Sequence, residues 1–277
     1  MRYLQKLLDF YLNSSLHVSL SVYALVRMTG FLFHIEAIHD SALFAFFGTI
    51  VGYNFVKYDA LARTQKLQMR IELKAIAVLS FLALVATGYY FLQLGRTTKV
   101  AAFAFLILTL LYTLPFFPNR SNARNWAGVK IYMVALCWVG VTLLLPVVEA
   151  DVPLTLTVVE VALQRFILIF VLILIFEIID LKVDDPNLKT VPQQIGVKRT
   201  KQVGVLLLLV FLSIECWNAD FASKAFAVKL GIASTTFLFL IFAHEKRSKY
   251  YSAFWVESIP LVWWLLLVSG LDFPVKS

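Results

Sequence analysis

The stretch that decides the fold, residues 156–184, reads LTVVEVALQRFILIFVLILIFEIIDLKVD. Its apolar part, residues 156–180, is longer than the roughly 20 residues that a helix needs to cross a bilayer. Glu177, Asp180 and Asp184 end this stretch at spacings i, i+3 and i+7, which puts three carboxylates on one face of a helix. Acidic groups at the end of a membrane helix are costly unless a cation lies between them. The stretch therefore predicts a membrane helix whose end binds a hard divalent ion such as Mg²⁺.

The composition extends this interpretation to the whole chain. Of its 277 residues 60% are hydrophobic, whereas a soluble domain has about 45–50%. Apolar runs near 20 residues recur throughout, which predicts an all-α polytopic membrane protein, a nine-transmembrane-helix bundle forming a single membrane-embedded domain over residues 1–277. The nine candidate spans are 14–33, 40–57, 73–94, 98–117, 128–148, 156–180, 202–218, 225–243 and 254–271.

The charges predict an orientation. Most Lys and Arg residues fall on one side when the N-terminus and the loops after spans 2, 4, 6 and 8 are placed together. That side is predicted to be cytoplasmic because cytoplasmic loops gather basic residues, and the C-terminus is then outside. The same rule explains the net charge of +8, so we expect the lipid bilayer as a partner and no nucleic acid. Cys137 and Cys216 lie inside apolar runs without metal-ligand or disulfide spacing.

The segment after the acidic face carries a resemblance to a known family. Lys189-Thr190-Val191-Pro192 and then Gly196 follow the three acids. Together with nine spans and polar segments after spans 2 and 6, this resembles the UbiA superfamily of intramembrane prenyltransferases. The second motif of that family is D-x-x-D-x-x-x-D followed by K-T-x-P and a glycine, and here only its first Asp is replaced, by Glu177. The stretch from Tyr112 also resembles the family's Y-x-x-P segment.

The first motif of the family, N-D-x-x-D-x-x-x-D after span 2, is matched here only at Asn54. Its three acidic positions are occupied by Phe55, Tyr58 and Ala62. Asp59 lies one residue out of register, about 100° around a helix. Asn54, Lys57 and Tyr58 are spaced i, i+3 and i+4 and share a face. Lys57 would bind a diphosphate as a point charge in place of one metal.

The resemblance implies a membrane prenyltransferase that moves an isoprenyl group from a Mg²⁺-bound prenyl diphosphate to a hydrophobic acceptor, either an aromatic ring or a lipid alcohol. It implies metal ligands at Glu177, Asp180 and Asp184, and catalytic roles for Asp180, Asp184 and Lys57. The predicted substrate-binding residues are Asn54, Tyr58, Tyr112, Lys130 and Lys189. Lys130 is included because it begins span 5 and can turn inward to a diphosphate.

Other interpretations of the same residues remain open. The acids also fit a solvated helix end, Lys57 and Lys130 also fit charges that only set topology, and Tyr112 also fits a packed aromatic. Arg165 lies mid-span and should face the bundle, with Glu160 or Glu36 as partner, unless its side chain snorkels outward. A catalytically impaired isoprenoid-lipid binding protein is the first alternative function, because one metal motif is missing. A secondary transporter is the second, and it would show paired charges across inverted repeats with helices broken at mid-depth.

Overall fold

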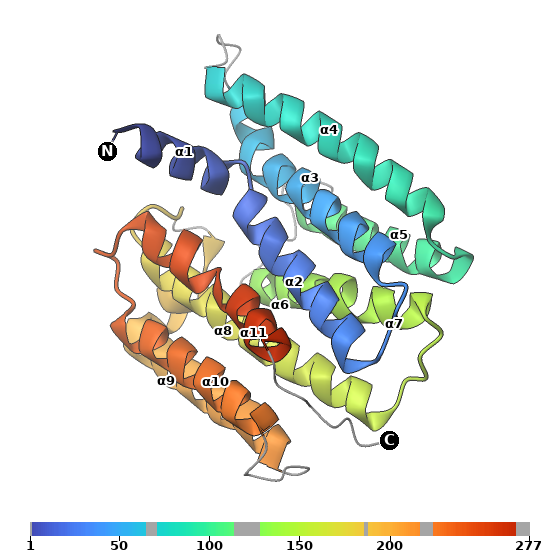
Figure 1. Ribbon diagram of the computed structural model, residues 1–277. Helices are drawn as coiled ribbons and strands as arrows, with labels where there is room; N and C mark the ends of the chain where they lie inside the picture. Colours follow the sequence, from blue (N-terminus) through green and yellow to red (C-terminus); the bar gives the residue numbers. More distant parts are fainter. Residues whose placement is uncertain (1, 65–70, 114–127, 186–187, 217–223, 270–277) are drawn as a thin grey trace.

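The structure, a computed structural model, describes residues 2–64, 71–113, 128–185, 188–216 and 224–269, and this part of the chain is helical without strands. The predicted all-α class is confirmed (Figure 1). The α-helices are α1 Arg2–Asn13, α2 Leu16–Leu32, α3 His39–Thr64, α4 Ile71–Gln93, α5 Arg96–Thr113, α6 Val129–Val139, α7 Leu145–Glu149, α8 Leu156–Asp180, α9 Val191–Cys216, α10 Lys224–Phe242 and α11 Ile259–Val268. Two π-helical turns, Gly140–Leu144 and Tyr251–Val256, join α6 to α7 and precede α11.

Each of the nine predicted spans overlaps one of these helices or helix pairs within the described residues, but the structure does not confirm nine crossings. Fewer of them are long and apolar enough to cross a membrane by themselves: five in the described part of the chain, or six if α1 and α2, bent by 56°, form one span. The five are Ile71–Gln93, Val129–Glu149, Leu156–Asp180, Ala225–Phe242 and Tyr251–Val268. Helix α5 opens with Arg96 and Lys99, and the first half of α9 is polar, which lowers their apolar content.

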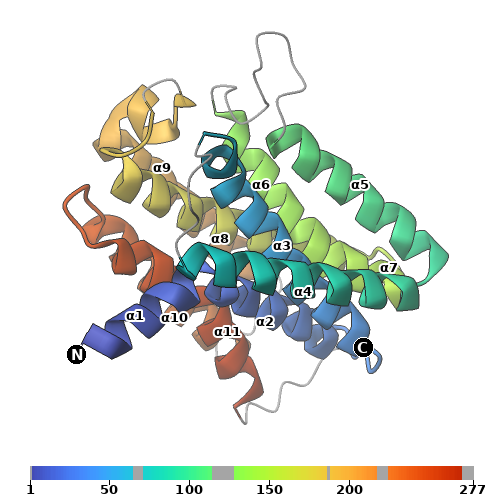
Figure 2. The same cartoon turned by 90° about the horizontal axis from the view of Figure 1, so that it is seen from above.

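Helix α8 is the centre of the bundle. Its buried side chains form the main core cluster with residues of α6, α9, α10 and α11, and they include Leu168, Leu174, Ile175 and Ile178. Helices α9 and α10 lie on one side of α8, and α3, α4 and α5 lie on the other (Figure 1, Figure 2). Because α8 is apolar around its whole circumference, it is buried against neighbours on several sides.

The chain breaks sharply between α1 and α2. Ser15 adopts a left-handed conformation with φ 63°, and the two helix axes differ by 56°. Helix α1 is amphipathic, and its apolar residues Tyr3, Leu4 and Leu7 are exposed. An amphipathic helix with an exposed apolar face is typical of segments that lie in a membrane interface.

The π-helical turn Gly140–Leu144 receives a buried cation from α8. Arg165 is fully buried, and its Nη1 donates to the carbonyl of Thr142 at 2.7 Å and to the Thr29 Oγ1 at 2.8 Å. The prediction that Arg165 faces the bundle is therefore confirmed. Its hydrogen-bond partners are threonines rather than Glu160 or Glu36, because the π turn brings a free backbone carbonyl to the guanidinium.

Candidate functional site

A cavity of about 700 Å³ lies between helices α3, α4, α5, α6 and α8. Along α6 and the π turn its wall runs from Lys130 to Leu145, which is about 22 Å of helix. Most of the wall is aliphatic or aromatic. Gly48, Gly52 and Gly88 contribute no side chain, and a Cβ at Gly52 or Gly88 would meet no atom within 4 Å. The cavity therefore offers a long apolar chamber, widened where α3 faces α4.

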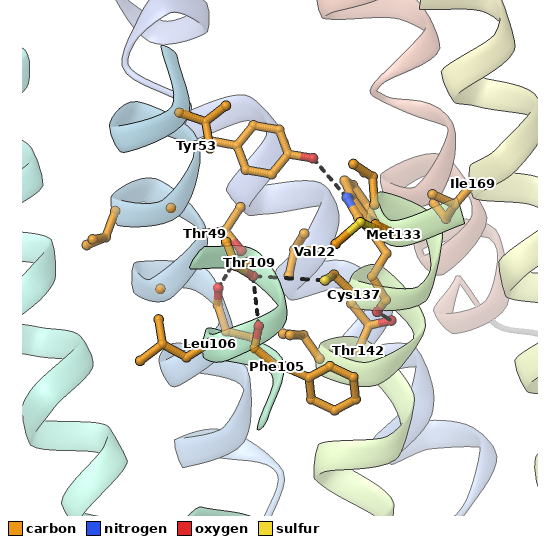
Figure 3. A pocket seen from close by; sticks show the side chains of 18 of the residues that line it. Val22, Thr49, Tyr53, Phe105, Leu106, Thr109, Met133, Cys137, Thr142 and Ile169 are labelled. Atoms are coloured by element: carbon orange, nitrogen blue, oxygen red, sulfur yellow. Dashed lines mark hydrogen bonds between the residues drawn. The ribbon is translucent and has the colours of Figure 1, made fainter. Parts of the chain in front are cut away.

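The middle of the cavity carries a few polar groups, which Figure 3 shows from close by. The indole Nε1 of Trp138 donates to the hydroxyl of Tyr53 at 2.8 Å. The Thr109 Oγ1 lies 3.9 Å from the Cys137 Sγ and also donates to the carbonyl of Phe105 at 2.9 Å. These hydroxyls are satisfied within the protein. The middle of the chamber thus has the space and the apolar wall for an apolar group, and its own hydroxyls are paired within the protein.

The three acids predicted from the sequence, Glu177, Asp180 and Asp184, line this cavity together with Lys130. Asp184 is held near Asp180 because helical geometry continues past the end of α8: the Asp184 N–H donates to the Asp180 carbonyl at 2.9 Å. Lys130 begins α6 beside the end of α8 and interacts electrostatically with both Glu177 and Asp180. The predicted helical face thus becomes an acidic cavity wall with one cation beside it.

Glu177 also organises the backbone of the next helix. Its side chain is 3% exposed, and its Oε2 accepts the Val191 N–H at 3.0 Å, at the start of α9. A carboxylate is favoured at a helix N-terminus because unpaired N–H groups and the helix dipole attract negative charge. The helix that begins within the K-T-x-P segment, α9, is therefore capped at its N-terminus by the carboxylate of Glu177. Lys189 has φ 47°, is exposed and lies outside the cavity wall.

The acids suit Mg²⁺ by type but are not gathered around a point. In the described part of the chain, no three His, Cys, Asp or Glu side chains are arranged to hold a metal ion. Carboxylates without a cation repel one another, and Asp184 interacts in this sense with both Glu177 and Asp180. Mg²⁺ usually takes one or two carboxylates and completes its shell with water and substrate phosphates. The donor set therefore fits an ion that enters with a phosphorylated ligand.

The second predicted face, Asn54, Lys57 and Tyr58 on α3, meets the break between α1 and α2 instead of the cavity. Lys57 Nζ donates to the Ser15 Oγ at 3.0 Å, and the Tyr58 hydroxyl donates to the Asn13 carbonyl at 2.9 Å. Asn54 bonds Ser15, the Ser14 carbonyl and Ser80. The three residues do share a face, as predicted. Contact with a diphosphate would require Lys57 to leave these partners.

The side chains of Tyr112 and Asp59 lie outside the described residues. Thr109, one helical turn before Tyr112, does line the cavity. A residue that the sequence prediction missed is Glu257, which lines the cavity between the π turn Tyr251–Val256 and α11. Its signal in the sequence was a single carboxylate within the last apolar run.

The cavity thus combines an acidic wall, an adjacent lysine and an apolar chamber in one space. No family model, no curated protein and no solved structure matches the chain.

Proposed function

We propose that the protein is a membrane prenyltransferase of the UbiA type, which binds a prenyl diphosphate with Mg²⁺ at the acidic wall and transfers the isoprenyl group to a hydrophobic acceptor. The observation that carries this proposal is the shared cavity: Asp180, Asp184 and Lys130 line the same 700 Å³ space as a predominantly apolar wall. A prenyl diphosphate has the matching composition, with a polyanionic head and a long apolar tail.

The head would bind where charge is available. Asp180 and Asp184 are the residues that would hold Mg²⁺, with Glu177 as the third acid of the wall, and the ion would supply positive charge to the leaving diphosphate. Lys130 adds a protein cation at the same wall. Preorganised cations of this kind stabilise charge that develops as the bond to the leaving group breaks. The aromatic and aliphatic wall keeps water from the reacting carbon.

The orientation that supports this function places nine helices across the membrane, with the N-terminus and the acidic wall on the cytoplasmic side. Basic residues gather at the loops on that side. Helices α3, α5 and α9 would cross with their more polar portions turned toward the bundle or the membrane surface. The C-terminus would then be outside.

An isoprenoid-lipid binding protein is the alternative that one observation favours. In the UbiA family this face of α3 carries metal ligands, but here it carries Asn54, Lys57 and Tyr58. All three contact the chain between residues 12 and 15, and Asn54 also contacts Ser80. The Mg²⁺ held by one acidic wall, together with one lysine, would neutralise less of the diphosphate charge than the two Mg²⁺ ions held between two acidic motifs. Binding without transfer is the outcome that distinguishes this alternative.

The test is a calorimetric titration of the detergent-purified chain with Mg²⁺ and farnesyl diphosphate, followed by measurement of released diphosphate. Asp180→Asn and Asp184→Asn should each weaken Mg²⁺-dependent binding at least about 100-fold, since each removes a ligand charge; losing one member of a buried charge cluster typically costs about 3–5 kcal/mol. Asp185→Asn is the matched control, because Asp185 lies outside the cavity wall.

Equal losses in all three variants would contradict the assignment of the acidic wall. Binding without release of diphosphate would favour the isoprenoid-lipid binding protein.

A further inference from the structure

A fourth carboxylate, Glu257, lines the cavity from a different helix than the other three acids. Its backbone is fixed on both sides. The Glu257 N–H donates to the Ser252 carbonyl at 3.1 Å, and the Glu257 carbonyl accepts the hydroxyl of Ser21 on α2. The π turn before it and Pro260 after it set the direction in which the helix enters the bundle. Glu257 is therefore held on a packed element rather than on a loop.

Two groups from other helices interact electrostatically with the Glu257 carboxylate. Lys57 of α3 attracts it, and Tyr11 of α1 lies close enough to interact with it electrostatically. Lys57 is itself held by the Ser15 Oγ and the Leu12 carbonyl. Among the described residues, no hydrogen bond or close ion pair engages the Glu257 carboxylate oxygens. They are therefore available to a ligand in the cavity, and Lys57 offsets a part of the cost of burying the charge.

The acids that line the cavity belong to two separate sets of charges, and only Glu257 of the second set lies in the cavity wall. Asp180 interacts with Asp184 and Lys130, whereas Glu257 interacts with Lys57 and Tyr11. If the first set holds the cation and the diphosphate, Glu257 is the carboxylate that remains for the second substrate. An ionised carboxylate only accepts hydrogen bonds, so it selects a ligand that carries a donor. In an apolar chamber the matching donor is the hydroxyl of a hydrophobic molecule.

We propose that Glu257 binds the hydroxyl of a phenol or alcohol acceptor and receives its proton during transfer. This inference rests on the proposed prenyl transfer. In the step, the acceptor oxygen forms a bond to the first carbon of the prenyl chain. The bond from that carbon to the diphosphate oxygen breaks, its electron pair stays with the diphosphate, and the acceptor proton passes to a Glu257 carboxylate oxygen. A positioned general base contributes about 10²–10⁴ in rate.

The experiment uses the full chain in detergent with Mg²⁺, farnesyl diphosphate and two probes, para-octylphenol and its methyl ether, which differ only in the O–H donor. The parent chain should form the farnesyl ether of the phenol and no product from the methyl ether. Glu257→Gln should bind farnesyl diphosphate with the parent's affinity but transfer at least about 100-fold more slowly. Glu257→Asp should recover part of the rate, because it keeps the carboxylate.

Glu245→Gln is the matched control, since Glu245 is an exposed carboxylate in an ion pair with Lys182 away from the cavity wall. It should transfer at the parent's rate. Unchanged transfer in Glu257→Gln, or loss of farnesyl diphosphate binding in that variant, would overturn the inference. A parent chain that binds the diphosphate but does not farnesylate the phenol would overturn it too, while leaving the lipid-binding alternative. A parent chain that shows no Mg²⁺-dependent binding would overturn the proposed function itself.

Discussion

Arg165 is the largest fully buried side chain in the described part of the bundle, and only one of its three nitrogens is satisfied. Nη1 makes three hydrogen bonds to Thr29 and Thr142, while Nε and Nη2 are buried without a partner among the described residues. A buried charge that lacks an anionic partner is unfavourable in a membrane protein. The guanidinium thus costs stability that its three hydrogen bonds only partly offset.

Arg165→Met should therefore leave stability unchanged or raise it, by up to about 1–4 kcal/mol. Methionine fills a similar volume without a charge, and the Thr142 carbonyl keeps the Thr29 hydroxyl as donor at 2.7 Å. Arg165→Ala is the comparison, because it leaves a void and should destabilise by about 2–5 kcal/mol. Thermal unfolding in detergent measures both. A large loss of stability in Arg165→Met would mean that the guanidinium has a further anionic partner.

Spacing along a helix predicted which side chains share a face, but not what the face meets. Glu177, Asp180 and Asp184 share a cavity wall as expected, and Lys130 joins them because α6 and α8 pack side by side. Asn54, Lys57 and Tyr58 also share a face, yet the left-handed Ser15 bends α1 onto it. Such a bend depends on tertiary contacts that periodicity does not record. Glu257 was missed for the same reason.

Among the elements, the π turn Gly140–Leu144 begins with a glycine against which an aromatic ring of α5 packs. A Cβ at Gly140 would lie 2.1 Å from the ring of Phe105 on α5, so a larger residue there requires the ring to move. Phe105 also lines the cavity. The contact therefore couples the packing of α5 against the π turn to the shape of the chamber.

Gly140→Ala should displace the Phe105 ring and destabilise the protein by about 1–3 kcal/mol, which is the usual cost of overpacking. Gly231→Ala on α10 is the matched control, since its Cβ would meet nothing within 4 Å and alanine favours a helix. Thermal unfolding of the two variants in the same detergent tests this. Equal stability of Gly140→Ala and the parent would show that α5 does not pack as closely as described.

Helix α1 is attached to the rest of the molecule by a charged contact. Asp9 accepts hydrogen bonds from Lys249 at 2.6 Å and from the Tyr250 hydroxyl at 2.8 Å. The hydrogen bond from Lys249 is the main cause that lowers the pKa of Asp9 below its ordinary value, and the bond from Tyr250 adds to it. Because the folded pKa is depressed, this contact stabilises the attached helix above the ordinary Asp pKa of about 4, and the stabilisation is lost as pH falls from there through the lowered folded pKa.

Acidification to well below pH 4 should therefore loosen α1, and Asp9→Asn should remove the pH dependence that this contact contributes. Limited proteolysis of the first 13 residues, compared between pH 4.5 and pH 2.5 with a protease that is active at both, gives the readout. Asp40→Asn is a suitable control, because Asp40 lies at the start of α3 and not at this contact. A parent-like pH response in Asp9→Asn would exclude the Asp9 contact as its cause.

The sequence predicted where helices lie along the chain better than it predicted which groups each helix contacts. Long apolar runs predicted where helices lie in the described part of the chain, because such runs form helices in a bilayer, but five or six of these helices are long and apolar enough to cross one. Helix α1 has no apolar run, since its apolar residues recur only on one face, so apolar runs alone do not predict it. No local sequence pattern predicted the two π turns.

For the whole molecule, the arrangement predicts sides as well as contacts. A reporter fused after Ser277 should lie outside the cytoplasm, and one inserted near Gln193 should lie inside, because basic residues concentrate at the loops beside the acidic wall. Alkaline phosphatase and green fluorescent protein fusions give opposite signals on the two sides. A cytoplasmic signal from the Ser277 fusion would mean an even number of crossings and would remove the shared face of the two polar loops.

The half-buried thiol of Cys137 in the cavity wall offers a chemical readout of whether the chamber is filled. The chain has one other cysteine, so a Cys216→Ser chain carries a single thiol. A small uncharged alkylating reagent that partitions into detergent would reach that sulfur in an empty chamber and be blocked by a bound tail. The labelling rate then reports the fraction of molecules whose chamber is occupied at equilibrium. The measurement needs no turnover, so it also detects a ligand that the protein binds but never transforms.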